Sequence, residues 1–215
     1  MTLDHVGLLR DAVRDMTAAL TDADPRAAVP ACPDWTVTDL AHHLGDVHRW
    51  AASILLTGTK QPPSERWYHG DDLPRWYATV AAVLLAAIEV TRPDDECWNF
   101  APVEQRAGFW RRRQLHETVV HTVDARQAAG TTPEPAAALA ADGVDEVFGV
   151  FLPRMLQRGY PPAVTVPVSV AADDTGDVWT LVPVAGGPPQ VRREPGDVVA
   201  HLHARAADLY LALWR

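Results

Sequence analysis

Cysteine and lysine are both scarce in this 215-residue chain. The cysteines, Cys32 and Cys97, are too few and too far apart for a disulfide framework or a cysteine-based zinc site. We therefore expect two buried thiols in a reducing cytoplasm. Lysine occurs once, at Lys60, in a chain that is rich in Ala, Arg, Asp, Val and Pro. This composition is typical of translation from a GC-rich genome and favours an actinobacterial source.

Basic charge and long hydrophobic runs are also lacking. The formal net charge is −9, whereas a nucleic-acid-binding protein normally carries a basic surplus. The longest apolar run, Val80–Ile88, is too short to cross a bilayer, and Met1–Leu20 alternates charged with apolar residues, unlike a signal peptide. With 47% hydrophobic residues the chain can still bury a core. These features predict a soluble cytoplasmic protein that binds neither nucleic acid nor a membrane.

Helical periodicity dominates the first three quarters of the chain. Apolar residues recur at three-to-four spacing in five segments, as in amphipathic helices: 3–21, 36–56, 72–90, a segment from 105 or 108 to 129, and 135–157. Thr36 is predicted to cap the second helix, with Asp39 completing a capping box. Gly130 is a suitable residue to end the fourth helix.

The periodicity changes from 3.6 to 2 after residues 159–162. Segments 164–170 and 178–184 alternate as strands around a turn at 173–177, and a last helix is expected over 195–214. The change predicts an α+β chain that is mainly α. We expect an antiparallel helical bundle over 1–158 and a small unit of a hairpin and a helix over 163–215.

A carboxylate and an imidazole share one side of the fourth predicted helix. Glu117 and His121 are one turn apart, so their side chains can hold one metal ion together. The arc that contains Gln114, Thr118 and Ala125 is expected to face solvent. On the second helix His43 flanks the apolar stripe, and with the pair it would give a three-ligand site with one open position. Taken alone, a pair such as Glu117 and His121 is more often a surface ion pair. A lone histidine in the position of His43 is more often a core residue.

Two segments resemble the signature regions of the mycothiol-dependent maleylpyruvate isomerase family, within the DinB-like superfamily. They are Cys32–Leu44 (CPDWTVTDLAHHL) and Phe109–Ala125 (FWRRRQLHETVVHTVDA). The tail, Asp197–Trp214, resembles the last helix of the family's small sterol-carrier-like C-terminal domain, although 163–215 is short for such a domain. The resemblance covers nearly the whole chain. It implies a metal-binding DinB-like bundle over 1–158 and an α/β domain over 163–215.

The resemblance also implies a metal site and a reaction. A divalent metal, zinc in first place, would be bound by His43, Glu117 and His121; the helical wheel favours His43 over the adjacent His42. A mycothiol-type low-molecular-weight thiol would serve as cosubstrate for isomerisation of, or S-transfer to, a small electrophilic substrate. Two further hypotheses stay open, namely a metal-dependent hydrolase that needs no thiol and a non-catalytic metal-binding or stress-linked module.

Two further residues of the fourth helix are candidates for supporting roles. Asp124 lies beside Glu117 on the wheel and could orient a metal ligand. Arg113 faces the same side and could hold a substrate carboxylate through a bidentate contact. An ion pair between Asp124 and Arg113 or Arg126 is an equally good interpretation.

Overall fold

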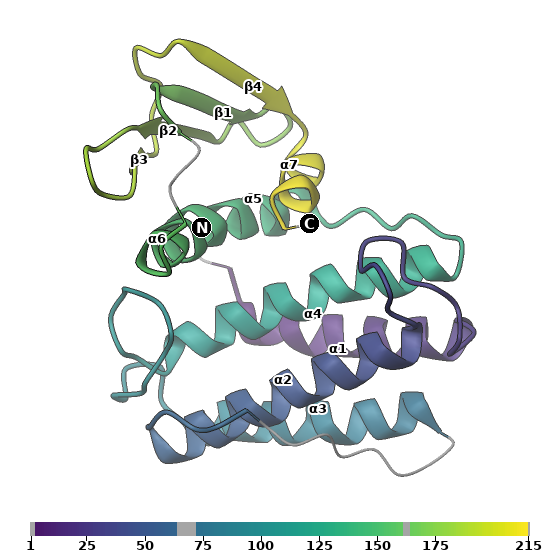
Figure 1. Cartoon of the computed structure of the whole chain (residues 1–215). Helices are drawn as coiled ribbons and strands as arrows, with labels where there is room; N and C mark the ends of the chain where they lie inside the picture. The colour runs from purple at the N-terminus through teal and green to yellow at the C-terminus, as the bar shows by residue number, and fades with distance from the viewer. Residues whose placement is uncertain (1–2, 64–71, 161–163, 215) are drawn as a thin grey trace. The chain divides into compact units, whose positions relative to one another are not determined.

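The structure of the chain, a computed structural model, describes residues 3–63, 72–160 and 164–214. Two compact units are present: Met1–Asn99 with Glu104–Pro133, and Phe100–Val103 with Glu134–Arg215. The first unit is helical and the second combines helices with a four-stranded mixed sheet (Figure 1). The expected α+β class, mainly α, is therefore confirmed.

The two units divide the chain at a different place from the one expected. Residues 134–158 group with the C-terminal residues, because α5 (Ala137–Glu146) packs against α7 (Ala206–Leu213). The ranges 1–158 and 163–215, parts of which lie outside the described residues, stay a prediction about independently folding domains.

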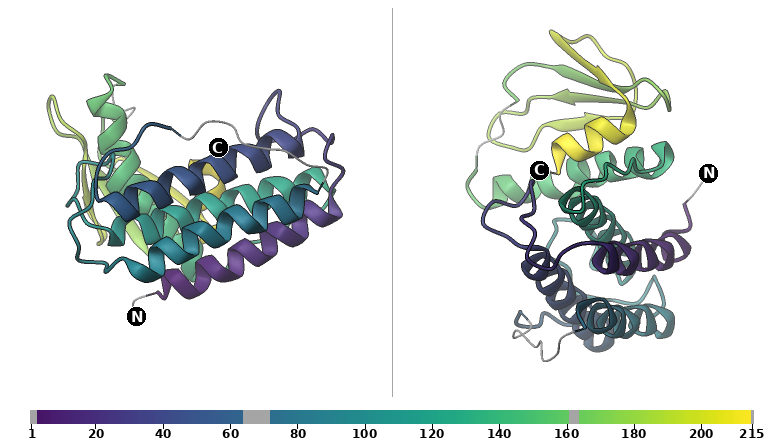
Figure 2. Two further views of the ribbon diagram at one scale, coloured as in Figure 1. Left: turned by 90° about the horizontal axis from the view of Figure 1, so that it is seen from below. Right: turned by 90° about the vertical axis from the view of Figure 1, so that its right-hand side faces the viewer.

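The first unit is a four-helix bundle. Its helices are α1 (His5–Asp22), α2 (Val37–Thr57), α3 (Leu73–Val90) and α4 (Gly108–Ala128). Helix α1 packs against α3 and α4, and α2 also packs against α3 and α4. Figures 1 and 2 show the four helices side by side, with α1 and α4 running one way and α2 and α3 the other. The antiparallel neighbours α2 and α4 are the helices on which the predicted metal ligands lie.

The helix boundaries follow local capping chemistry. The Thr36 hydroxyl accepts from the Asp39 amide while the Asp39 carboxylate accepts from the Thr36 amide, which confirms the predicted capping box of α2. Gly58 ends α2 in the left-handed conformation, at φ +69°, where glycine has no steric penalty. Asp72 caps α3 through the Arg75 amide. The capping box fixes the start of the helix that presents His43.

Helix α3 is long and strongly apolar. Within the described residues it is the one helix that is long and apolar enough to cross a membrane, with a mean hydropathy of 1.4. Its side chains Tyr77, Leu84 and Ile88 are nevertheless buried, and the helix packs against α1 and α2. A core helix of a bundle has the same composition, so this feature is weak evidence for a membrane span.

The second unit contains a distorted helical segment. The single helix expected over 135–157 is divided into α5, a π-helical turn at Val147–Phe151 and α6 (Leu152–Gln157). Pro153 lies at the start of α6. A proline lacks the N–H that an α-helix needs and its ring clashes with the preceding turn, so a helix that contains one is commonly distorted there.

The sheet of the second unit has the strand order β3-β2-β1-β4. Strands β1 (Val168–Ala172) and β2 (Val178–Val182) form the predicted antiparallel hairpin, and β3 (Gln190–Arg192) extends it beside β2. The expected helix over 195–214 is wrong in its first half. Residues Ala200–Ala204 form β4, which pairs in parallel with β1, and only Ala206–Leu213 is helical. Pairing with β1 overrides the helical preference of alanine and leucine in this segment.

Candidate metal centre

The three predicted metal ligands meet between α2 and α4. His43 Nε2 lies 3.3 Å from Glu117 Oε1, and His121 Nε2 lies 3.5 Å from the same oxygen. One ligand atom of each residue lies within 4.8 Å of those of the other two. His43 and Glu117 are 74 positions apart in sequence, and α2 brings His43 to α4. Glu117 and His121 are 4 positions apart and share one face of α4. Their role as metal ligands stays a prediction.

The donor atoms fit a small divalent cation. Zinc bonds of about 2.0–2.2 Å in tetrahedral geometry would place neighbouring donor atoms about 3.3–3.6 Å apart. The two separations from Glu117 Oε1, 3.3 and 3.5 Å, fall in this range. Two imidazoles and one carboxylate are donors that zinc and several transition metals accept. The geometry and the donor chemistry are therefore both suitable for a three-ligand site.

The second carboxylate oxygen of Glu117 is held by Arg113. Arg113 Nη2 donates to Glu117 Oε2 at 3.0 Å, and only 3% of the Arg113 side chain is exposed. Burial alone would raise the pKa of Glu117, but hydrogen bonds from His121 and His43 and the charge of Arg113 outweigh it and hold this pKa well below its usual value. Glu117 is thus an ionised carboxylate whose Oε1 faces the two histidines.

His121 is oriented by Asp124. Its Nδ1 lies 2.9 Å from Asp124 Oδ2, and Asp124 is almost completely buried. Burial opposes protonation of this histidine, but the hydrogen bonds to Asp124 and Glu117 outweigh burial and raise the pKa of His121 to about 9. A carboxylate on one ring nitrogen fixes the ring so that the other nitrogen can face a metal. Asp124 thus contacts the predicted ligand His121, and its role in orienting a metal ligand stays a prediction.

The Trp35 ring lies beside the two histidines. Its ring centroid lies 4.9 Å from that of His43 and 6.4 Å from that of His121. Trp35 ends a tight turn, in which its amide donates to Cys32 O at 3.0 Å. Pro33 occupies the second position of this turn, and Asp34 occupies the third with φ +69°. Proline followed by a residue with positive φ is typical of a type II turn.

A buried hydrogen-bond network lies next to the site. His48 Nδ1 contacts Gln114 Oε1 at 2.7 Å, and His48 Nε2 contacts the Tyr77 hydroxyl at 3.2 Å. Burial lowers the pKa of His48 to about 4, so this histidine is neutral at physiological pH. Gln114, Thr118 and Ala125 are all buried, so the expectation that their arc of α4 faces solvent is wrong. Its polar side chains form hydrogen bonds inside the bundle. A helical wheel does not distinguish such buried polar residues from polar residues that face solvent.

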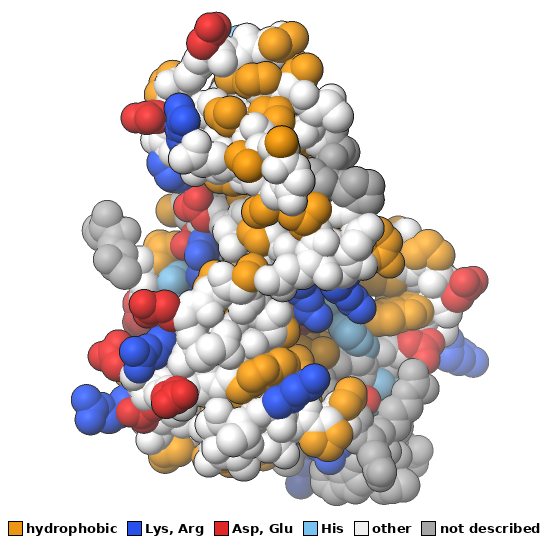
Figure 3. All heavy atoms as spheres, turned by 60° about the vertical axis from the view of Figure 1, so that its left-hand side comes forward, with side chains coloured by type: hydrophobic (Ala, Val, Ile, Leu, Met, Phe, Trp, Pro, Cys, Tyr) orange, Lys and Arg blue, Asp and Glu red, His pale blue; other side chains and the backbone are white. Residues whose placement is uncertain are grey.

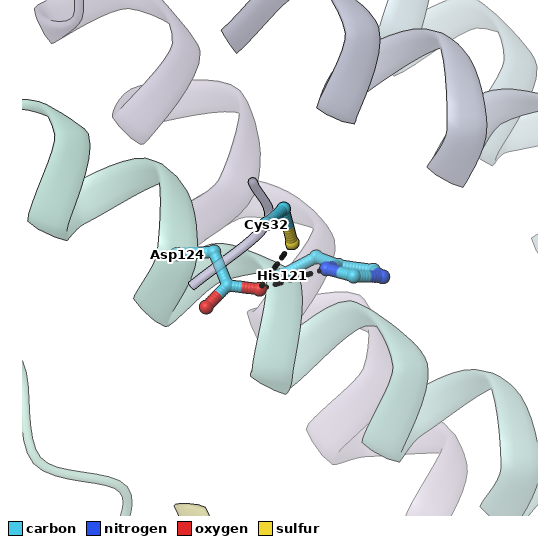
Figure 4. A group of neighbouring side chains, drawn as sticks. All are labelled: Cys32, His121 and Asp124. Atoms are coloured by element: carbon cyan, nitrogen blue, oxygen red, sulfur yellow. Dashed lines mark hydrogen bonds and ion pairs between the residues drawn. The ribbon is translucent and has the colours of Figure 1, made fainter. Parts of the chain in front are cut away.

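Arg113 and Cys32 have different surroundings from those expected. The sequence suggests that Arg113 holds a substrate carboxylate, but its guanidinium is buried and contacts Glu117, which favours a positioning role. Cys32 was expected to be a buried thiol, whereas it is partly exposed and its Sγ lies 4.0 Å from Asp124 Oδ2 (Figure 4). Cys97 is buried as expected. The sequence could have indicated that Cys32 lies near the site, because Cys32 belongs to the same motif as Trp35 and His43.

The three predicted ligands differ in their exposure to solvent. The side chain of His43 is 38% exposed, against 19% for Glu117 and 14% for His121. On the face drawn in Figure 3, histidine side chains reach the surface of the molecule beside apolar and charged ones. Two of the three predicted ligands are therefore largely buried, and His43 is the one most accessible to solvent.

Comparison with known proteins agrees with this arrangement. The family model of the mycothiol maleylpyruvate isomerase N-terminal domain matches residues 6–126, more than half of the chain. Two matching crystal structures are of the mycothiol-dependent maleylpyruvate isomerase and of a mutant of it in which a histidine is replaced by alanine. They have TM-scores of 0.65 and 0.66 and sequence identities of 12% and 11%, and each alignment covers 98% of this chain and 87% of the other.

No curated protein matches the chain. At 11–12% identity the crystal structures establish the fold alone. The match of the family model spans α1 to α4 almost completely and includes His43, Glu117 and His121. By that match, the chain belongs to the family of the mycothiol maleylpyruvate isomerase N-terminal domain.

Proposed function

We propose that the protein is a metal-dependent enzyme that uses a mycothiol-type thiol to isomerise a small electrophilic substrate of the maleylpyruvate type. The observation that carries the proposal is the convergence of His43 Nε2, Glu117 Oε1 and His121 Nε2 on one point within a family of mycothiol-dependent isomerases. Three protein ligands leave the open position that catalytic zinc sites have. The structurally similar proteins are a mycothiol-dependent maleylpyruvate isomerase and its mutant, which supports both the thiol and the reaction.

The protein side chains would provide a preorganised set of ligands. Arg113 holds Glu117 Oε2, so that Oε1 is the oxygen presented to the metal. Asp124 accepts from His121 Nδ1 and leaves Nε2 toward the site. His43 is the most exposed of the three ligands, and Trp35 packs on its ring. These contacts fix the direction of each donor atom before the metal or the substrate binds.

The metal would supply a thiolate at neutral pH, because a thiol that coordinates a metal is deprotonated. A thiolate is a strong nucleophile and can add to a cis double bond that is conjugated to a carbonyl group. Rotation about the resulting single bond and elimination of the same thiolate give the trans isomer and return the thiol. The thiol is therefore required but not consumed, which separates isomerisation from S-transfer, where one thiol is used for each product.

A hydrolase is the second candidate, because the same donor set also suits water. Two histidines and one glutamate occur as ligands in zinc hydrolases, in which the metal lowers the pKa of bound water to about 7. A hydrolase would turn over its substrate without any thiol. Omission of the thiol therefore distinguishes the two candidates.

The test is a cis–trans isomerase assay with maleylpyruvate, in which zinc and mycothiol are each supplied or omitted. We expect isomerisation only when both are present and no net consumption of mycothiol. His121→Ala should abolish turnover, because two remaining ligands hold zinc poorly, whereas the matched control His203→Ala, on exposed strand β4, should retain it. Hydrolysis of an ester or amide without added thiol would favour the hydrolase, and loss of thiol into a product would favour S-transfer.

A further inference from the structure

A cysteine lies beside the candidate metal centre and is held there by a rigid turn. Cys32 begins the turn that Pro33 and Asp34 form, and its amide donates to Val29 O at 3.1 Å. An isolated antiparallel bridge between Ala28 and Thr36 closes the segment at its base. The position of Cys32 is thus fixed by backbone hydrogen bonds as well as by its side-chain contacts.

The turn places the thiol against the side of His121 that faces away from His43 and Glu117. Cys32 Sγ lies 4.0 Å from Asp124 Oδ2, and the same oxygen lies 2.9 Å from His121 Nδ1 (Figure 4). One ligand atom each of Cys32, His121 and Asp124 lies within 4.8 Å of those of the other two. Sulfur, nitrogen and carboxylate oxygen therefore converge on a second point, beside the one that His121 Nε2 faces.

We propose that Cys32, His121 and Asp124 form a second metal position, for a thiophilic divalent ion, that shares His121 with the first. The two nitrogens of an imidazole ring point in different directions. In His121, Nε2 faces Glu117 and Nδ1 faces Asp124. Binding at the second position releases the thiol proton of Cys32 and the Nδ1 proton of His121. The ion then replaces the hydrogen bond by which Asp124 orients this ring.

The donor set determines the class of ion. A thiolate ligand selects soft or borderline ions such as Cd²⁺ and Zn²⁺ over Mg²⁺ and Ca²⁺, which prefer oxygen. The neutral thiol can donate to Asp124 at 4.0 Å, but a thiolate beside the carboxylate would be repelled unless a cation lies between them. A divalent ion supplies that charge, and the His121 ring gives a third ligand through Nδ1, as a neutral imidazole when the second position alone is filled and as an imidazolate when both positions are filled.

The inference goes beyond the proposed function, since the first position and its thiol chemistry do not require Cys32. It also makes a distinct statement about the two cysteines. Cys97 is buried, its Sγ contacts Ile54 O, and burial raises the pKa of its thiol. Of the two cysteines, only Cys32 should bind metal. Cys97 therefore serves as the internal control for metal binding by a cysteine.

In the experiment, the metal-free protein is titrated with CdCl2. The ultraviolet absorption of the cadmium–thiolate bond is recorded after each addition. The first position contains no sulfur, so this absorption reports the second position alone. Four proteins are compared: wild type, Cys32→Ser, Cys97→Ser and His43→Ala. Thermal unfolding of each metal-free protein checks that it is folded, and thiol-dependent isomerase activity of the zinc protein is measured separately.

We expect the absorption in the wild type to saturate with one thiolate per chain and to be lost in Cys32→Ser. Cys97→Ser and His43→Ala should retain it, because neither residue contributes to the second position. Absence of the absorption in the wild type, or its persistence in Cys32→Ser, would overturn the inference. Its loss in His43→Ala would also do so, because the thiolate would then belong to a single joint site. Failure of the isomerase assay alone would refute the proposed function and leave this inference standing.

Discussion

The buried histidine His48 makes the stability of the bundle depend on pH in a direction that can be calculated. Its side chain is fully buried, and burial lowers its pKa from 6.5 to about 4. The unfolded chain binds the His48 proton at higher pH than the folded protein does. As pH falls below about 6.5 the unfolded state therefore gains protons first, and the folded state loses relative stability until the pH reaches about 4.

The magnitude follows from the difference between the two pKa values. One pKa unit corresponds to about 1.4 kcal/mol, so a shift of about 2.5 units contributes on the order of 3 kcal/mol. This stability is fully present above pH 6.5 and is lost over the acidic interval. A loss of about 3 kcal/mol is a large part of the 5–15 kcal/mol that typically stabilises a domain.

Urea unfolding at several pH values between 4 and 7.5, on metal-free protein in chelating buffer, measures the effect. His48→Asn is the comparison, because asparagine can still donate to Gln114 but does not titrate in this range. The free energy of unfolding should fall between pH 6.5 and 4 by about 3 kcal/mol more in the wild type than in the variant. Parallel curves for the two proteins would refute the reasoning.

Three further substitutions, two of them paired with a control variant, test the groups around the centre. Asp124→Asn removes the carboxylate that orients His121 and should weaken zinc binding about 10–100-fold, measured by competition with a fluorescent chelator. Arg113→Met should have an effect of similar size, whereas Arg126→Met, which breaks an exposed ion pair, should have none. Asp34→Val should destabilise the protein by about 1–2 kcal/mol in urea unfolding, because a β-branched residue is strained at φ +69°, while Asp34→Gly should be nearly neutral.

Features that depend on neighbouring residues were predictable from the sequence. Thr36 and Asp39 lie three residues apart and form the capping box that the pattern predicts. Glu117 and His121 share a face of α4 because the geometry of a helix requires it. The meeting of this pair with His43 is different. Apolar periodicity places each helix in a core but does not say which helix is its neighbour, so this contact was expected from family resemblance.

Features that depend on distant residues were not predictable in this way. Ala200–Ala204 has a helix-compatible sequence and becomes a strand because β1 pairs with it. Gln114 was expected in solvent, yet it is buried because His48, 66 residues away in sequence, forms a hydrogen bond with it. The contact of Cys32 with Asp124 likewise joins a loop to a helix across 92 residues. Local patterns contain no information about such partners.

The central claim is that His43, Glu117 and His121 together hold one metal ion, and zinc binding tests it most directly. The measurement is zinc content and affinity in protein carrying Cys32→Ser, which removes the thiolate of the second position. One zinc ion per chain is predicted, and additional replacement of His43 by Ala, Glu117 by Gln or His121 by Ala should each lower the affinity at least about tenfold. Tight binding of zinc that is unchanged in all three would contradict the account.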